Sequence, residues 1–225
     1  MKSQKQIAFI FFSLTAEAEY RYKRLTRFEE ADKAIAHTLI HQTRQTLESL
    51  GYPVFHFNES NQRGQSFGQR LANAYQDIFD LGFQSIIAVG NDAPDLLSLD
   101  MDAVVSHARL GKNVIGPTKR HGAYLIALSR DSFEYHSFTN LPWQQCRLLI
   151  ALEEYCQGNL AMLPVLQDIN SYRDLRQVIT SAESVVTKLL LRIVLAIKTA
   201  KKHYIYQFES EIHASFKLLR APPHL

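Results

Sequence analysis

The sequence predicts an α/β protein in which helices cover both faces of a mostly parallel sheet, with a helical extension at the C-terminus. Short, continuous apolar runs alternate along the chain with longer segments whose apolar residues recur at helical spacing. Hydrophobic residues make up 46% and charged residues 21% of the 225 residues, a composition that can bury a sizeable core. No apolar stretch reaches the roughly 18 residues that a transmembrane helix needs.

The first half of the chain predicts two strand–helix pairs. Residues 7–12 are a continuous apolar run, which is typical of a central strand buried on both faces. Residues 29–50 carry apolar side chains at helical spacing, and Gly51 follows as a helix C-cap. Residues 53–57 are the second predicted strand, and residues 67–81 are the second helix, with one apolar stripe.

The same alternation continues through the second half of the chain. Glycine or serine marks the helix ends here as well, with Gly111 after one helix and Ser171 before the last. The further predicted strands are residues 85–89, 113–116, 123–128 and 161–166. The further predicted helices are residues 100–110, residues 143–155 and a segment that begins after Ser171. Because ligands bind at the carboxyl ends of parallel strands, the loops that follow the strands are the places to look for chemistry.

Residues 1–175 form the predicted sheet domain and residues 176–225 the extension, which carries eight Lys and Arg against three Asp and Glu. Residues 181–203 predict a long amphipathic helix, and a second segment covers residues 204–219. Its apolar stripe comprises Val186, Leu189, Leu190, Ile193, Ile197 and Ala200. The stripe needs a partner, and we expect a homodimer contact; packing on the sheet domain is the alternative. A basic face for lipid or nucleic acid ranks third, since no nucleic-acid motif accompanies it.

The loop at residues 90–96 reads Gly-Asn-Asp-Ala-Pro-Asp-Leu and directly follows a predicted strand. Asp92 could point into the crevice and hold Mg²⁺ or Mn²⁺, which in turn would neutralise a diphosphate. From the residues alone, a simpler interpretation is favoured, in which Asn91 or Asp92 caps a short helix with Pro94 in its first turn.

Three other loops carry polar side chains. Residues 116–124 place two cations and His121 beside glycines and could contact phosphate or a sugar hydroxyl, although a plain turn with Gly122 at positive φ is the simpler interpretation. Residues 62–70 lead into a helix with Ser66 as N-cap, and its free amides could accept an anion. Asp168 follows the last strand and could be a second metal ligand, a carboxylate that orients an acceptor, or a turn residue.

Other classes of site lack their motifs. The sequence contains no Walker loop, no dinucleotide-binding Gly-x-Gly-x-x-Gly, no Gly-x-Ser-x-Gly and no His-Glu-x-x-His, and its nine histidines have no ligand spacing. Cys146 and Cys156 form no metal-ligand pattern and are poorly placed for a disulfide. Reduced thiols and the lack of a signal-peptide cleavage site after the first apolar run predict a cytoplasmic protein.

Four segments, taken in order, resemble the bacterial radical-SAM/selenodomain-associated transferase family. Residues 62–71 resemble its Gln-x-Gly-x-x-Gly-x-Arg, and residues 88–96 its Gly-(Ser/Thr)-Asp-x-Pro-x-Leu. Residues 116–128 resemble Gly-Pro-x-x-Asp-Gly-Gly-Tyr-Tyr-Leu-Ile-Gly-Leu, and residues 163–175 resemble Leu-Pro-x-x-x-Asp-(Val/Ile)-Asp-Thr-x-x-Asp-Leu. Pro142 and Trp143 match a further Pro-Trp. The resemblance implies the nucleotide-diphospho-sugar transferase fold, which is glycosyltransferase-A-like.

The chain departs from this family at three places, which makes it a divergent member. Residues 18–25 stand where the family has Pro-Gly-x-x-Lys-Thr-Arg-Leu, and only Arg24 and Leu25 match. Glu19 replaces the glycine and is expected to place a negative charge near a diphosphate. The family's Asp-Gly-Gly becomes Arg-His-Gly at residues 120–122, and the second Asp of the last motif becomes Asn170.

The resemblance implies roles for particular residues. The implied nucleotide-binding residues are Ser13, Arg24, Gly64, Gly68 and Asp92, and Asp92 is also the implied metal ligand. The implied substrate-binding residues are Arg120, His121, Gly122, Tyr124 and Trp143. The candidate catalytic residues are His121 and Asp168. The implied cofactor is Mg²⁺ or Mn²⁺.

The expected function is transfer from a nucleotide-activated sugar with the help of a divalent cation. The expected partners are accordingly a nucleotide sugar or nucleotide and a second copy of the chain, without nucleic acid. Because the first loop is altered, a catalytically degraded homologue that binds a ligand or another protein is the alternative. Nucleotidyl transfer is a further alternative, since related folds perform it.

Overall fold

A computed structural model describes residues 5–181, 184–197 and 199. The strands are β1 (Lys5–Phe12), β2 (Val54–Phe57), β3 (Phe83–Val89), β4 (Asn113–Pro117), β5 (Ala123–Ser129) and β6 (Leu160–Met162). The α-helices with labels are α1 (Ala16–Tyr22), α2 (Glu29–Ser49), α3 (Phe67–Asp80), α4 (Met101–Arg109), α5 (Tyr135–Thr139), α6 (Leu148–Tyr155) and α7 (Tyr172–Ser181). Two short 3₁₀ helices are η1 (Pro94–Ser98) and η2 (Arg130–Ser132), and residues 185–197 form one more helix.

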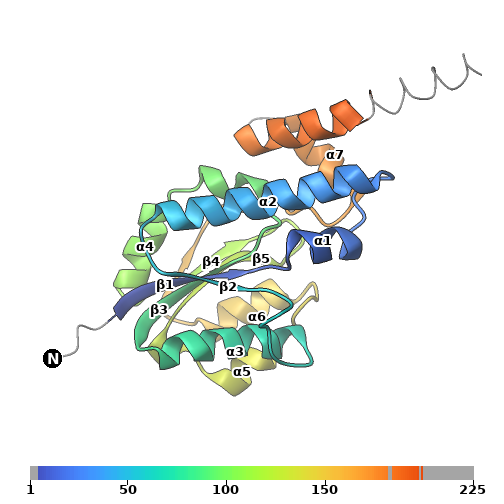
Figure 1. The fold of residues 1–225 in the computed structure, drawn as a ribbon. Helices are drawn as coiled ribbons and strands as arrows, with labels where there is room; N and C mark the ends of the chain where they lie inside the picture. The colour runs from blue at the N-terminus through green and yellow to red at the C-terminus, as the bar shows by residue number, and fades with distance from the viewer. Residues whose placement is uncertain (1–4, 182–183, 198, 200–225) are drawn as a thin grey trace, which may run out of the picture.

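The six strands form one mixed sheet in the order β2-β1-β3-β5-β4-β6. β5 runs antiparallel to both of its neighbours, and the other neighbouring pairs are parallel. The carboxyl ends of β1, β3, β4 and β6 therefore meet at one edge of the sheet (Figure 1). The predicted mostly parallel sheet is confirmed, and the loops at this edge become neighbours in space.

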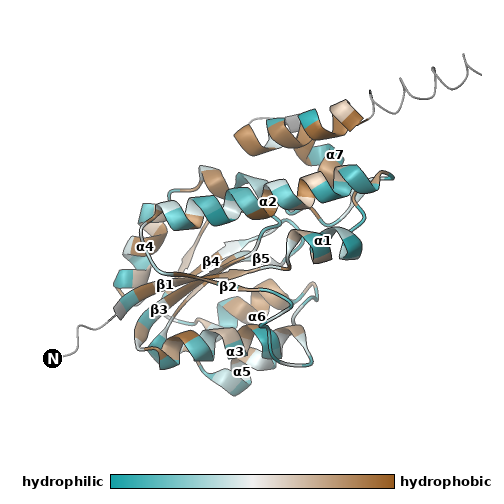
Figure 2. Cartoon of the chain, in the orientation of Figure 1, coloured by the Kyte–Doolittle hydropathy of each residue, from teal (hydrophilic) through white to brown (hydrophobic). Residues whose placement is uncertain are grey.

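Helices cover both faces of the sheet, as predicted. In β1, Ala8 and Ile10 point into the core shared with α3, α5 and α6, whereas Phe9 and Phe11 point into the core shared with α2 and α4. Both sets of side chains are fully buried, which explains why this strand reads as a continuous apolar run. Figure 2 shows the apolar residues gathered on the strands between the two helical layers.

The C-terminal helices form a third layer over α2 (Figure 1). Val186 and Leu190 are buried against Ile35 and Leu39 of α2 and Leu175 of α7. Val186 and Leu190 of the apolar stripe are thus covered within the chain, as in the alternative of packing on the sheet domain. Leu189, Ile193 and Ile197 remain partly exposed, and the homodimer stays a prediction.

The extension also differs from the predicted single helix over residues 181–203. α7 ends at Ser181, and a second helix begins at residue 185, where the Ser184 hydroxyl accepts a hydrogen bond from the Thr187 amide (3.2 Å). Ala200 and the predicted segment 204–219 lie outside the described residues. The predicted domain boundary after residue 175 falls inside α7.

One helix and one strand are several residues shorter than the sequence predicts, and two short α-helices were not predicted. The predicted helix at residues 143–155 begins only at Leu148, because residues 143–147 form turns and Gln144 has a φ of +62°. The predicted strand at residues 161–166 pairs only as far as Met162. α1 and α5 are single short helices of seven and five residues without a long apolar repeat, which is why pattern reading misses them. None of the described helices is long and apolar enough to cross a membrane.

Candidate functional site

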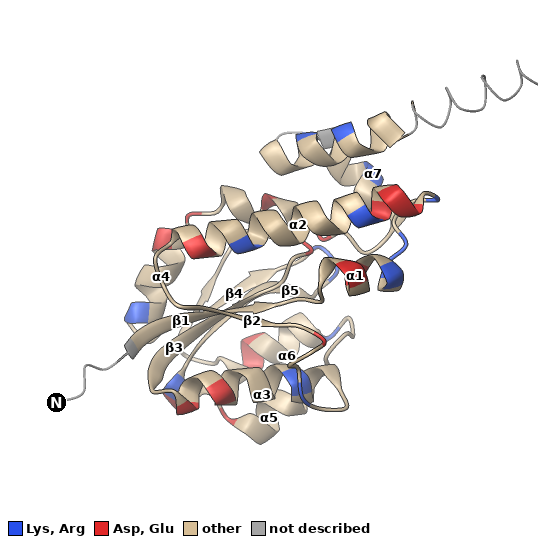
Figure 3. Ribbon diagram, in the orientation of Figure 1, with Lys and Arg blue, Asp and Glu red and all other residues tan. Residues whose placement is uncertain are grey.

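A cleft of about 760 Å³ opens at the carboxyl edge of the sheet. Apart from Lys5 at the start of β1, the strands contain no Asp, Glu, Lys or Arg, so the charges around the cleft come from loops and helices (Figure 3). The charged side chains that line it are Glu19, Lys23, Arg70, Asp92, Arg120 and Asp168. Cations and carboxylates are thus mixed on its walls.

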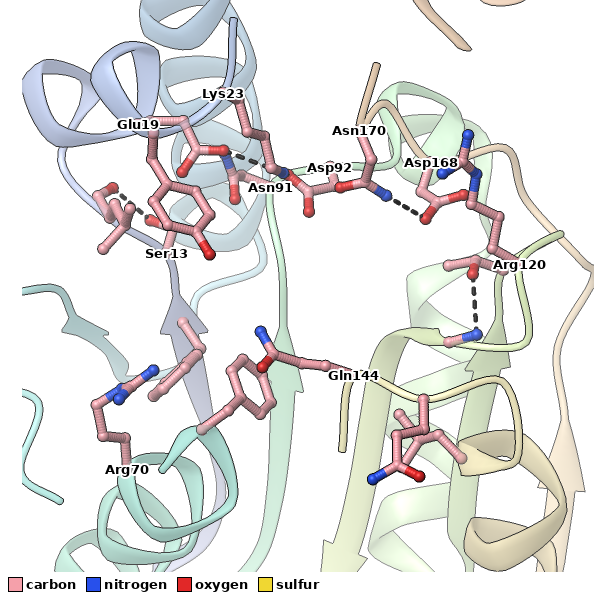
Figure 4. Close-up of a pocket in the computed structure, with 18 of the residues that line it drawn as sticks. Ser13, Glu19, Lys23, Arg70, Asn91, Asp92, Arg120, Gln144, Asp168 and Asn170 are labelled. Atoms are coloured by element: carbon pink, nitrogen blue, oxygen red, sulfur yellow. Dashed lines mark hydrogen bonds and ion pairs between the residues drawn. The ribbon is translucent and has the colours of Figure 1, made fainter. Parts of the chain in front are cut away.

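One wall is formed by α1 and the loop after β3. Thr15 caps α1, and the helix places Glu19 and Lys23 four residues apart on one face. The Lys23 Nζ lies 3.1 Å from the Glu19 carboxylate and 2.5 Å from the Asp92 Oδ1. Figure 4 shows these three side chains in a row that continues to Asn170 and Asp168. Glu19, expected to place a negative charge near a diphosphate, shares the Lys23 ammonium with Asp92.

Burial and charge act against each other in this wall. Burial acts to lower the pKa of the Lys23 ammonium, but Asp92 and Glu19 outweigh burial and the pKa is raised above its ordinary value. The pKa of the Glu19 carboxyl is also raised, because burial outweighs the attraction of Lys23. Lys23 therefore carries its charge throughout the neutral pH range.

Asp92 does not cap the short helix that follows it. η1 begins at Pro94, and its N-cap residue is Ala93, which has no side-chain capping bond. The favoured capping interpretation is therefore wrong, because the Asp92 carboxylate turns toward Lys23 instead. Its backbone carbonyl accepts a hydrogen bond from the Ile169 amide (2.9 Å), which fastens the loop after β3 to the segment after β6.

That second segment places Asp168 in the same wall. Asp168 is 7% exposed, and its Oδ2 accepts a hydrogen bond from the Asn170 amide group (2.6 Å). Its other oxygen, Oδ1, is buried and has no hydrogen-bond partner among the described residues. Burial raises the pKa of Asp168, and the negative charge of Asp92 raises it further. Asp168 thus lines the cleft and carries one buried oxygen that has no hydrogen-bond partner among the described residues, which is an unusual state for a polar atom.

Arg120 stands beside this segment. Its guanidinium lies 2.6 Å from the Asp174 carboxylate, yet half of the side chain remains exposed and lines the cleft. Burial acts to raise the pKa of Asp174, but bonds from Ser171 and Asn170 and the Arg120 charge outweigh it and lower the pKa. Asp174 thus holds Arg120 in place.

Ser13 follows β1 and lines the same cleft as the ion pairs. Its hydroxyl is 2.9 Å from the His56 Nε2, and His56 stacks on Phe11. Burial lowers the pKa of His56, so the ring is neutral at neutral pH. Ser13 lines the cleft, as expected from the sequence, and His56 fixes its orientation.

Several predicted ligand residues do not line the main cleft. Gly68 packs against Trp143: a Cβ on Gly68 would collide with the indole ring and the Thr139 carbonyl. Gly64 has a φ of +128° and lies against Gln69. A side chain at either position would collide with neighbouring atoms at the start of α3. This packing, rather than the close approach of a ligand, accounts for the two glycines. Arg24 lies at the α1–α2 turn and lines separate cavities there.

The turn between β4 and β5 also differs from expectation. His121, not Gly122, has the positive φ (+62°), and its exposed side chain does not line the cleft. Gly122 does line it, next to Arg120. Tyr124 packs over Gly116 and donates to the Pro164 carbonyl (3.0 Å), and together with Trp143 it borders a smaller adjoining cavity of about 220 Å³.

Sequence reasoning missed Lys23, Arg70 and the turn around Gln144 as cleft residues. Arg70 reaches the cleft from α3, and Gln144 points in from the opposite side to the ion pairs (Figure 4). A signal existed for Lys23, since Glu19 and Lys23 have the spacing of a helical ion pair. No sequence signal marked Gln144, which reaches the cleft because of its left-handed backbone.

Two carboxylates at this edge of the sheet are the candidate ligands of a divalent cation. Carboxylates of Asp92 and Asp168 would suit Mg²⁺ or Mn²⁺. In the part of the chain that the structure describes, however, no group of three or more His, Cys, Asp or Glu could hold a metal ion, and the Asp92 carboxylate already contacts an ammonium. As arranged, these side chains do not fit a divalent cation, and the expected metal stays a prediction.

The fold of this chain is similar to that of solved structures. A protein from Desulfovibrio desulfuricans G20, provisionally named a nucleotide-diphospho-sugar transferase, matches with a TM-score of 0.70 at 19% identity over 83% of this chain and 94% of that one. Rv0371c from Mycobacterium tuberculosis H37Rv, solved in complex with manganese, matches with a TM-score of 0.44 at 14% identity over 78% of this chain and 98% of that one. The second score is too low to carry an argument. The first confirms the predicted fold and says nothing of the chemistry.

Sequence comparison gives the family. Among curated proteins no match is found. The family model described as "Uncharacterized protein conserved in bacteria (DUF2064)" matches residues 23–145, which is more than half of the chain. The expected link to radical-SAM and selenodomain proteins stays a prediction. On the match over residues 23–145, the chain belongs to the DUF2064 family of bacterial proteins.

Proposed function

We propose that the protein is a glycosyltransferase-like enzyme that binds a nucleotide-activated sugar in the cleft and transfers the sugar to an acceptor hydroxyl. The observation that carries this proposal is the meeting of three cations and two carboxylate loops at the carboxyl edge of the sheet. Lys23, Arg70 and Arg120 reach the cleft from separate elements. Asp92 and Asp168 follow β3 and β6 at the same edge.

The cations are the groups that would bind the diphosphate. Arginine and lysine are the usual protein partners of phosphate oxygens. Because these three cations reach the cleft from different walls, they could surround the negative charge of a diphosphate. Phe12 and Phe67, whose ring centroids are 5.6 Å apart, give the cleft an apolar side next to Ser13. A nucleobase needs such a surface, so we assign this side to the base and the side near Asp168 to the sugar and acceptor.

Asp168 is the group that we assign as general base. It would take the proton of the acceptor hydroxyl while the oxygen forms a bond to the anomeric carbon. The bond from that carbon to the diphosphate oxygen breaks in the same reaction, and the electron pair leaves with the nucleoside diphosphate. Burial that raises the pKa of a carboxyl brings its basicity closer to neutral pH, which suits this task. The cations would stabilise the charge on the leaving diphosphate.

A screen of nucleotide sugars tests the proposal. The full chain would be mixed with UDP-, GDP-, CDP- and ADP-sugars, with and without Mn²⁺, and both the melting temperature and nucleotide release would be measured. We expect at least one donor to raise the melting temperature by about 3–6 °C at ten times its Kd. Release of nucleoside diphosphate supports sugar transfer. No stabilisation by any donor would reject the proposal and favour an interaction module on this fold.

A second assay and one outcome of the screen separate the remaining alternatives. In the second assay, a nucleoside triphosphate and a sugar phosphate replace the nucleotide sugar, and nucleotidyl transfer would release pyrophosphate. Binding without any release would indicate a ligand-binding protein that has lost turnover. The pairing of Asp92 with Lys23 is the feature that favours this last alternative over an active enzyme dependent on a metal at Asp92.

A further inference from the structure

Two carboxylates hold the ammonium of Lys23 at the cleft wall. The Nζ is 2.5 Å from Asp92 and 3.1 Å from Glu19, and the Lys23 side chain is 17% exposed. An ammonium has three N–H donors, and these contacts occupy two of them. The third N–H is free for a ligand in the cleft that Lys23 lines.

The backbone at Lys23 is fixed by α1, and the ammonium is held by two carboxylates. Lys23 is the C-cap residue of α1, and its amide donates to the Glu19 carbonyl (2.8 Å). Glu19 is 10% exposed in its side chain and lies one helical turn before Lys23. The loop that carries Asp92 is in turn fixed by its bond to the Ile169 amide. All three charged groups are therefore anchored before any ligand arrives.

A cation at this point faces the same task as a divalent metal at Asp92. Such a metal would contact the Asp92 carboxylate on one side and phosphate oxygens on the other. The Lys23 ammonium contacts the Asp92 Oδ1, and Lys23 lines the cleft. A divalent ion bound to the same carboxylate would lie close to this ammonium, and the repulsion between the two cations opposes binding of both at once.

We propose that Lys23 is the resident cation of this site, which binds the diphosphate of the ligand directly and takes the place of a divalent metal at Asp92. This inference rests on the proposed function for the identity of the ligand. The claim that Lys23 takes the place of a metal at Asp92 does not depend on the proposed function. Asp92 then acts as a positioning residue that holds Lys23, together with Glu19, and the protein binds nucleoside diphosphates without metal.

The first arm of the test uses Mn²⁺ alone. Electron paramagnetic resonance would measure Mn²⁺ bound by the wild type and by Lys23→Met. We expect no Mn²⁺ at Asp92 in the wild type, a bound ion in Lys23→Met, and its loss again when Asp92→Asn is added. Mn²⁺ binding by the wild type that Asp92→Asn abolishes would overturn the inference, whatever the ligand of the cleft is.

The second arm measures nucleotide affinity in EDTA. UDP, GDP, CDP and ADP would be titrated into the wild type, Lys23→Met and Lys23→Arg by calorimetry. We expect metal-free binding of at least one nucleotide, weakened about 10- to 100-fold in Lys23→Met, as for a lost charge-assisted hydrogen bond. Lys23→Arg should retain more affinity than Lys23→Met. In separate titrations without EDTA, Mn²⁺ should restore binding to Lys23→Met only.

Controls separate the possible failures. Lys33→Met removes an exposed lysine that is paired with Glu29 on α2, outside the cleft, and should change neither arm. Because Lys23→Met leaves Glu19 buried without its cation, Glu19→Gln/Lys23→Met provides a second variant with no unpaired charge there. Equal affinity of Lys23→Met and the wild type in EDTA, or wild-type binding only with Mn²⁺, overturns the inference. No nucleotide binding under any condition rejects the proposed function, and the Mn²⁺ arm then decides the role of Lys23.

Discussion

At the scale of single residues, the site depends on what each charged group has beside it. Lys23 has two carboxylates, Arg120 has Asp174, and Asp168 has one hydrogen bond and one buried oxygen without a described partner. The folded environment of Asp168 thus disfavours its ionised form, because burial raises its pKa. A group kept in an unfavourable setting inside a cleft is a candidate for chemistry.

Replacing Asp168 by Asn should therefore abolish transfer while the nucleotide still binds. General base catalysis contributes typically about 10²- to 10⁴-fold, so kcat for the best donor should fall by about that factor. The KM for the donor should change little, because the diphosphate contacts are elsewhere. Asp131→Asn, an exposed change in η2, is the matched control. An Asp168→Asn enzyme with wild-type kcat would remove Asp168 from the mechanism.

The same substitution should stabilise the fold at neutral pH. The folded-state pKa of Asp168 is raised by burial, so its protonated form is favoured in the folded protein, and that advantage is present at low pH and lost as pH rises through the folded pKa. Asp168→Asn removes the ionisation and should raise the urea midpoint at pH 7 but hardly at pH 4. Identical differences between variant and wild type at both pH values would contradict this.

At the scale of elements, a short helix and a glycine show why the site was only partly predictable. Asp92 and Asp168 were found because each directly follows an apolar run that reads as a strand. Lys23 was missed because α1 has only seven residues and no apolar repeat. Gly68 was read as a ligand-binding glycine because its contact with Trp143 joins residues far apart in the sequence, which no local pattern reveals.

The close packing of α3 against the turn at Trp143 allows a test of whether Gly68 has a steric role rather than a ligand-binding role. Gly68→Ala should lower stability by about 1–3 kcal/mol, since the methyl group would meet the indole and a backbone carbonyl. The loss should be smaller in a Trp143→Leu background, which makes room for the methyl group. Chemical denaturation of the four proteins gives the coupling. An unchanged stability together with weakened nucleotide binding would instead restore the ligand-binding role of Gly68.

At the scale of the whole molecule, the third helical layer is part of the fold rather than an appendage. Leu175, Val186 and Leu190 bury Ile35 and Leu39, and α7 also supplies Asp174, the partner of Arg120. The alternation of strands and helices predicted the two inner layers, because each element there carries its own periodicity. The alternation did not predict that the C-terminal helices pack on α2, since an apolar stripe alone does not show which surface will bury it.

Truncation after Ser171 should therefore do more than remove a tail. Exposure of Ile35 and Leu39 should cost about 3–6 kcal/mol, at roughly 1.5–3 kcal/mol for each buried side chain, and should promote aggregation. Truncation after Thr199, which keeps the helix at residues 185–197, is the control. Circular dichroism melts and light scattering would report both effects. A shortened protein that melts like the full chain and stays monodisperse would show that the layer is dispensable.

The backbone bond from Ile169 to Asp92 has a consequence for how the protein acquires its site during synthesis. A chain that has reached only residue 145 contains β1 to β5 and Asp92, but neither β6 nor the segment that fastens the loop of Asp92. Folding of the sheet can thus run ahead of assembly of the cleft. The last wall closes only when residues 77 positions apart meet, a contact that is slow to form because of its long loop. A destabilising substitution near β6 would thus leave a molecule that forms most of its hydrophobic core but does not complete the wall of its cleft.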